Sequence, residues 1–147
     1  MSEDVDQVFK RILVGVDDSA DAQLAFKYAV RRAAKDGATL IITSILESDD
    51  MNVYQALTKD YVHGERDELI GHLKEYEAIA AAGGVHNIEM IVDEGDPGET
   101  IVERVIPATA ADLLIIGSLS KKGVRKYFGS QAAYMAKYSP ISVMIIR

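Results

Sequence analysis

The sequence predicts an α/β fold, with an open five-stranded parallel sheet of the flavodoxin-like or Rossmann-like kind and helices on both faces. Two observations predict it. Short apolar segments alternate with segments whose apolar residues recur every three or four positions, in the order β-α-β-α-β-α-β-α-β. The expected strands one, two, four and five are nearly unbroken apolar runs, which is typical of strands buried on both faces. We expect one domain over residues 1–147, with residues 1–9 flexible.

The first strand and helix are predicted from a buried run followed by a capping residue. Lys10–Val16 is the expected first strand, and Ser19 is a good N-cap for the helix that follows. Small and apolar residues recur along one side of this helix, and Gly37 is expected to end it. Thr39–Leu46 is the expected second strand.

The remaining elements follow from the same patterns. In chain order they are an acidic loop at residues 47–56, a long helix over Leu57–Ala82, a third strand around Ile88–Val92, a turn at Gly95–Gly98, a short helix over Ile101–Ile106 that Pro107 ends or kinks, a fourth strand at Leu113–Ile116, a helix over Gln131–Tyr138 and a last strand at Ile141–Ile146.

The third strand alternates apolar and polar residues, and this half-exposed pattern indicates a sheet edge. The predicted strand order is therefore 3-2-1-4-5, with its switch point between strands one and four. Ligands of such sheets bind at the switch point, beyond the carboxyl ends of the strands. Asp17 and Gly117 stand at those two ends.

The connection Gly117–Ser130 (GSLSKKGVRKYFGS) links a buried strand to a helix. Its cations are Lys121, Lys122, Arg125 and Lys126. A helix N-terminus presents N–H groups and partial positive charge, so glycines and cations beside it indicate phosphate binding. The same cluster also fits a solvated surface loop, and both interpretations stay open at this point.

Composition excludes several classes of protein. The chain has no cysteine and a net charge of −7, and 48% of its residues are hydrophobic. We therefore expect a globular protein without disulfides or thiolate metal sites, and no general affinity for nucleic acid or an anionic membrane. Without an apolar leader or a membrane-length apolar run, the expected location is the cytoplasm.

Three segments together resemble the universal stress protein family. They are VGVDDS at 14–19, EGDPGETIVE at 94–103, and IIGSLSKKGVRKYFGS through SPISVMIIR at 115–147. The resemblance covers nearly the whole chain. It implies the open α/β sheet described above, a role in the stress response, a homodimer, and membership of either an ATP-binding or a non-binding group.

The ATP-binding group carries the motif G-x2-G-x9-G-[ST] after strand four. Gly117 matches its first glycine, and Gly129 and Ser130 match its closing pair. Ser120 stands where the second glycine belongs, and residues 121–128 form a spacer that is one residue short.

The resemblance also implies a set of nucleotide contacts. Gly15, Val16 and Asp17 would lie by the base and ribose, and Ile45 would face the adenine. The ribose would rest on Ile116 and Gly117, near Ser120, and the phosphates would meet Gly129, Ser130, Gln131 and Ala132. Asp17 suits a ribose or a magnesium ion held with ATP, and the alternative interpretation is an ordinary cap on the first helix.

The leading hypothesis is a nucleotide-responsive regulatory homodimer that binds ATP or another adenine nucleotide. No general base or nucleophile motif is evident, so at most weak ATP hydrolysis is expected. The alternative is a non-nucleotide-binding family member that acts as a dimeric protein-interaction module, which Ser120 and the short spacer favour. A phosphoacceptor receiver would use Asp17, Asp18 and Asp93, but the last strand carries no lysine to complete that set.

The hydrophobic last strand lies at a sheet edge in the predicted order. An exposed apolar edge favours pairing with its own copy across a two-fold axis. We therefore expect the homodimer to form through residues 141–146, with its protein partners unknown.

Overall fold

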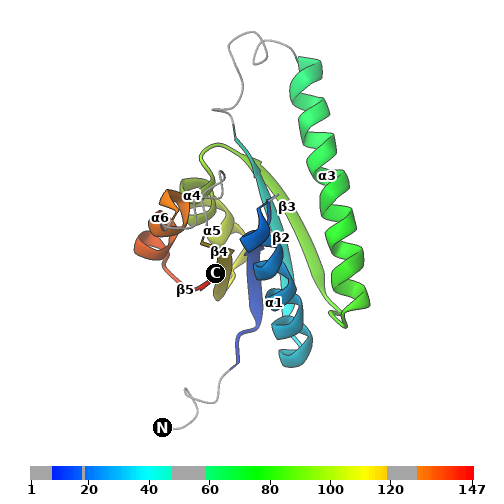
Figure 1. Ribbon diagram of the computed structural model, residues 1–147, viewed down its shortest axis with the longest axis vertical. Helices are drawn as coiled ribbons and strands as arrows, with labels where there is room; N and C mark the ends of the chain where they lie inside the picture. The colour runs from blue at the N-terminus through cyan, green and yellow to red at the C-terminus, as the bar shows by residue number, and fades with distance from the viewer. Residues whose placement is uncertain (1–7, 18, 48–58, 119–128) are drawn as a thin grey trace.

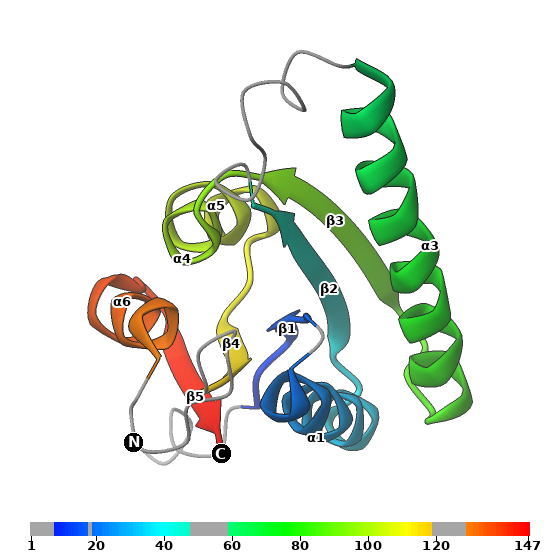
Figure 2. The same ribbon diagram turned by 45° about the horizontal axis from the view of Figure 1, so that its top comes forward.

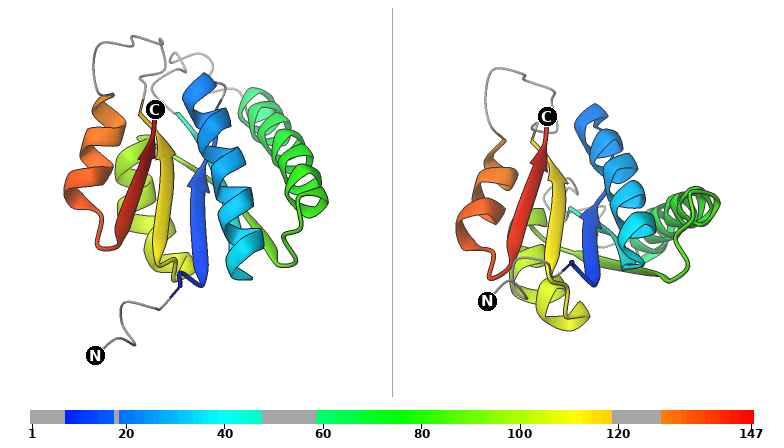
Figure 3. Two further views of the ribbon diagram at one scale, coloured as in Figure 1. Left: turned by 60° about the horizontal axis from the view of Figure 1, so that its bottom comes forward. Right: turned by 90° about the horizontal axis from the view of Figure 1, so that it is seen from below.

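The structure, a computed structural model, describes residues 8–17, 19–47, 59–118 and 129–147 (Figure 1). Within these residues, five parallel strands form one sheet in the order β3-β2-β1-β4-β5, which confirms the predicted fold. The strands are β1 (Arg11–Gly15), β2 (Thr39–Leu46), β3 (Ile88–Glu94), β4 (Leu113–Gly117) and β5 (Ser142–Ile146). Because the strands are parallel, their carboxyl ends lie at the same end of the sheet, as the arrowheads of β1, β4 and β5 in Figure 3 show.

Helices cover both faces of the sheet (Figure 2). On one face lie α1 (Ala20–Asp36) and α3 (Lys59–Ala82). On the other lie α4 (Pro97–Thr100), η2 (Ile101–Val105), α5 (Ile106–Thr109) and α6 (Ser130–Tyr138). Each layer encloses its own apolar core against the sheet, and residues of β1, β2 and β4 contribute to both cores.

Helix α1 begins and ends where the sequence predicts. The Ser19 hydroxyl accepts a hydrogen bond from the Ala22 N–H at 3.1 Å and caps the first turn. At the other end Gly37 adopts φ 65°, a left-handed conformation that often ends helices and that glycine adopts more readily than other residues. Gly37 therefore ends α1 at Asp36, and the buried Ala38 follows it.

The helical segment after β3 is longer than predicted. It starts at Pro97, capped by Asp96, whose side chain accepts from the Glu99 N–H, and it passes Pro107 to end at Thr109. A π-helical turn precedes the proline, with the Ile106 N–H bonded to the Ile101 carbonyl. Pro107 then lies at the start of the last α-helical turn, where its missing N–H and fixed φ cost least.

Strands β3 and β5 are the two edges of the sheet, as predicted. The three central strands are β2, β1 and β4, and most of their residues are buried. Residues 1–7, 48–58 and 119–128 lie outside the described part of the chain, so the expected flexible start and most of the acidic loop are not described. Among the described helices, none combines the length and apolar character that a membrane crossing requires.

Candidate functional site

A cleft opens at the carboxyl ends of β1, β2 and β4. Its volume is about 420 Å³, within the range of small-molecule binding sites. The predicted site residues that line it are Gly15, Val16, Asp17, Ile45, Ile116, Gly117, Ser130, Gln131 and Ala132. The two distant segments that carry Asp17 and Ser130 therefore meet at the same cleft.

Two predicted site residues are not among the lining residues. Gly129 is buried beside the cleft, where it is the N-cap of α6 and its N–H donates to the Ser118 carbonyl at 2.8 Å. This N–H is thus committed to the protein itself. Ser120 and the cationic residues 121, 122, 125 and 126 lie outside the described residues.

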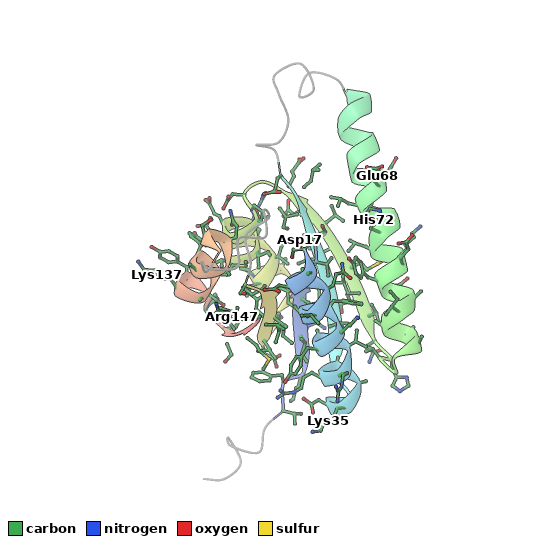
Figure 4. All side chains as sticks on the ribbon, viewed as in Figure 1. Asp17, Lys35, Glu68, His72, Lys137 and Arg147 are labelled. Atoms are coloured by element: carbon green, nitrogen blue, oxygen red, sulfur yellow. The ribbon has the colours of Figure 1, made fainter. Side chains whose placement is uncertain are left out.

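Asp17 stands directly after β1, near the start of α1 (Figure 4). Its Oδ1 accepts a hydrogen bond from the Ser19 N–H at 2.7 Å, and its carbonyl accepts from the Gln23 side chain at 3.2 Å. The N-cap is Ser19, so Asp17 stabilises the turn that precedes α1. The Asp17 side chain is exposed and lines the cleft, so its structural contact leaves it available to a ligand.

The end of β4 is packed tightly onto α1. A Cβ atom on Gly117 would lie 2.8 Å from both the Ala22 nitrogen and the Asp21 carbonyl carbon. Next along the chain, the buried Ser118 hydroxyl donates to the buried Asp21 carboxylate at 2.8 Å, and the Ser118 N–H donates to the Ile146 carbonyl at 3.1 Å. These contacts fix the floor of the cleft between β1 and β4.

The first turn of α6 forms one end of the cleft. N–H groups in a first turn have no partner within their helix, and no acidic side chain lies in this turn. The Gln131 side chain is bonded to the start of α4, because its Oε1 accepts from the Gly98 N–H at 2.6 Å and its Nε2 donates to Asp96 at 2.9 Å. Gln131 therefore joins α6 to α4. The backbone N–H groups of Ser130 to Ala132 lie in the first turn of α6, where the partial positive charge of a helix N-terminus favours an anion.

Tyr134 follows one turn later on α6 and packs beside Gly98. Partial desolvation raises the pKa of its hydroxyl above the ordinary value, and the carboxylates of Glu103 and Glu99 raise it further. The hydroxyl therefore stays neutral at physiological pH and adds no negative charge near the start of α6.

Sequence reasoning missed several residues of the cleft. They are Ser19, Ala22, Thr43, Ser44, Pro97, Ile101 and Met135, whereas Glu47, the first residue of the expected acidic loop, was expected near the mouth of the cleft and lines it. Thr43 is two residues before Ile45 on the same strand face, so the period of two could have found it. Ile101 lies in the segment 94–103 that carries the family resemblance, but its contribution depends on how η2 packs over the sheet, which the sequence pattern does not give.

Among the described residues, no three His, Asp or Glu side chains converge as a metal ion requires. His72 lies on α3 with Glu68, away from Asp17 (Figure 4). His86 is exposed after that helix.

The fold and cleft define a class of molecule: an α/β protein with a ligand-sized cavity at the switch point of a parallel sheet. The family model described as the universal stress protein family matches residues 9–147. The chain therefore belongs to the universal stress protein family.

Individual relatives agree with this assignment. The Staphylococcus haemolyticus protein named "Putative universal stress protein SH1215" is 28% identical over 140 residues, covering 95% of this chain and 85% of that protein. The structure of universal stress protein UspA from Lactobacillus plantarum superposes with a TM-score of 0.85 at 22% identity, covering 97% of this chain and 100% of that one.

Two further similar structures are nucleotide complexes. A universal stress protein in complex with cAMP has a TM-score of 0.71 at 25% identity, covering 96% of this chain and 98% of that one. The universal stress protein from Archaeoglobus fulgidus in complex with dAMP has a TM-score of 0.67 at 18% identity, covering 96% and 100% of the two chains.

Proposed function

We propose that this protein binds an adenine nucleotide, ATP in the first place, in the cleft and works as a regulatory protein of the stress response. The observation that carries the proposal is the cleft itself. It is lined by apolar side chains, by the carboxylate of Asp17 and by the first turn of α6. A nucleotide has matching parts: a base with apolar faces, a hydroxylated sugar and an anion.

The order of the strands supports one orientation of the ligand. Strands β2 and β4 flank β1, so two strand spacings, about 10 Å, separate them. That span suits a nucleoside. The base would lie over β2 between Ile45 and Ile101, and the phosphates would lie beyond β4, where the N–H groups of Ser130 to Ala132 favour negative charge.

Asp17 suits the middle of this arrangement. A carboxylate at a strand end accepts hydrogen bonds from ribose hydroxyls, and it can help to hold Mg²⁺ beside a polyphosphate. The complexes of two relatives with cAMP and dAMP support an adenine nucleotide in preference to another ligand. We assign no catalytic residue, and we propose that any hydrolysis of ATP is slow.

A second function is favoured by one sequence observation. Ser120 replaces the second motif glycine and the spacer 121–128 is one residue short, which would suit a family member that works only through protein contacts. The two functions differ in whether the cleft takes up nucleotide.

Titration of the purified protein with ATP and Mg²⁺ in a calorimeter tests this difference. We expect saturable binding below about 1 mM ATP, equivalent to more than about 4 kcal/mol of binding free energy, and a matching rise in Tm. Mass spectrometry of small molecules released from the folded protein should show a co-purified adenine nucleotide. No heat of binding and no thermal shift at about 1 mM ATP would instead support the protein-contact function.

We also propose that the protein is a homodimer through the exposed edge of β5. This strand pairs only with β4 among the described strands, and Val143, Met144, Ile145 and Ile146 are only partly buried. A second copy would cover these apolar side chains and supply the missing strand neighbour. Sedimentation equilibrium at micromolar concentration should give twice the chain mass of 16.0 kDa. A single-chain mass would contradict the dimer, and Val143→Lys should shift the protein toward that mass.

A further inference from the structure

Thr43 on β2 has a hydroxyl that the fold does not use. The residue is fully buried, with 0% of its surface exposed. Its Oγ1 is the one buried side-chain oxygen or nitrogen among the described residues that has no hydrogen-bond partner. A buried hydroxyl that has lost water without gaining a partner destabilises the folded protein, so such groups are rare unless something else binds them.

Another buried threonine, Thr109, shows the ordinary arrangement. The Thr109 hydroxyl, at the end of α5, donates to the Val105 carbonyl at 2.8 Å. Thr43 differs because it lines the cleft, whereas Thr109 does not. The residue that carries the unsatisfied hydroxyl thus lines the proposed nucleotide site.

The register of the sheet places Thr43 at the base end of that site. It is paired with Gly15 on β1 and Ile91 on β3, and it shares a strand face with Ile41 and Ile45. Ile45 lies about 7 Å further along the strand, nearer its carboxyl end. Thr43 is therefore the deeper of the two on β2, the strand that lies across β1 from the phosphate end.

We propose that the Thr43 hydroxyl hydrogen-bonds the polar edge of the bound purine and selects for it. This inference rests on the proposed function, which supplies the ligand. A hydroxyl can donate to a ring nitrogen and accept from an exocyclic amine, and adenine offers both groups. Ile45 and Ile101 would contact the apolar faces of the ring, whereas Thr43 offers it a buried hydroxyl, and Ser44 and Glu47 also line the cleft near the end of β2.

The test compares Thr43→Val, Thr43→Ser and the control Thr109→Val with the wild type, by Tm without ligand and by Kd for ATP and AMP. Valine has the shape of threonine without its hydroxyl. Thr43→Val should raise the Tm of the ligand-free protein by roughly 3 °C and weaken both nucleotides about tenfold. Thr43→Ser should bind like the wild type. Thr109→Val should lower the Tm and leave both Kd values unchanged.

The outcomes separate this inference from the proposed function. If the wild type binds neither nucleotide, both fail. If the wild type binds and Thr43→Val binds equally well, only the role of Thr43 is overturned. A Tm of Thr43→Val at or below that of the wild type would also overturn it, because the hydroxyl would then have a partner in the free protein. Equal weakening of nucleotide binding in Thr43→Val and Thr43→Ser would overturn it too, because serine keeps the hydroxyl. Weaker binding of ATP with unchanged binding of AMP would also overturn it, because both nucleotides carry the same base.

Discussion

Gly117→Ala is expected to lower the free energy of unfolding by about 3 kcal/mol, which corresponds to a fall in Tm of roughly 10 °C for a chain of this size. The new Cβ would lie 2.8 Å from the Ala22 nitrogen and from the Asp21 carbonyl carbon. Both atoms belong to the backbone of α1, so no side-chain rotation can relieve the overlap. Strand β4 and helix α1 would have to separate, which would also stretch the hydrogen bond between Ser118 and Asp21.

Gly15→Ala is the matched control, because Gly15 ends β1 as Gly117 ends the neighbouring β4. A Cβ on Gly15 would lie 3.6 Å from Ile101 Cδ1 and 3.7 Å from Ile116 Cγ2, which are ordinary contacts. Its free energy of unfolding should stay within about 0.5 kcal/mol of the wild type. Urea unfolding of both variants measures the difference. Equal stability of the two variants would contradict the close approach of β4 to α1.

Gly117 also shows where prediction from the sequence reaches its limit. The strand-to-helix pattern indicates that a glycine at this place permits a close backbone approach, and the structure has such an approach. Among the described residues, the start of α1 makes this approach, and Gly117 also lines the cleft. A sequence pattern can indicate that space is needed beside a residue, but which group fills the space depends on the packing of elements nearly 100 residues apart.

Local signals predicted the elements well because their causes are local. Ser19 and Gly37 bound α1 through hydrogen bonds and dihedral angles within a few residues, and the alternation in β3 records its position at an edge. The bounds of the helical segment over 97–109 were harder to predict, because the π-helical turn before Pro107 cannot be recognised from the spacing of apolar residues. The convergence of Asp17 and Ser130 followed from strand order alone, whereas the unpaired Thr43 hydroxyl appears only once every neighbour is placed.

Filling the cleft is expected to have the largest effect on the ligand. Gly15→Leu should weaken ATP binding at least about 100-fold, equivalent to roughly 2.7 kcal/mol. The Cβ of residue 15 would lie between Ile101 and Ile116, two side chains that line the cleft. The further carbons of leucine would extend from there into the space proposed for the base and ribose. Because this space is open, the variant should fold with a Tm near that of the wild type.

Gly15→Ala again provides the comparison, since its single methyl group makes only ordinary contacts and should leave most of the 420 Å³ open. Calorimetric titration of the three proteins with ATP measures the effect, and circular dichroism establishes that each is folded. A graded loss, small for alanine and nearly complete for leucine, is the signature of a ligand inside the cleft. A folded Gly15→Leu protein that binds ATP as the wild type does would place the nucleotide elsewhere, and the orientation across β1 would then have to be abandoned with it.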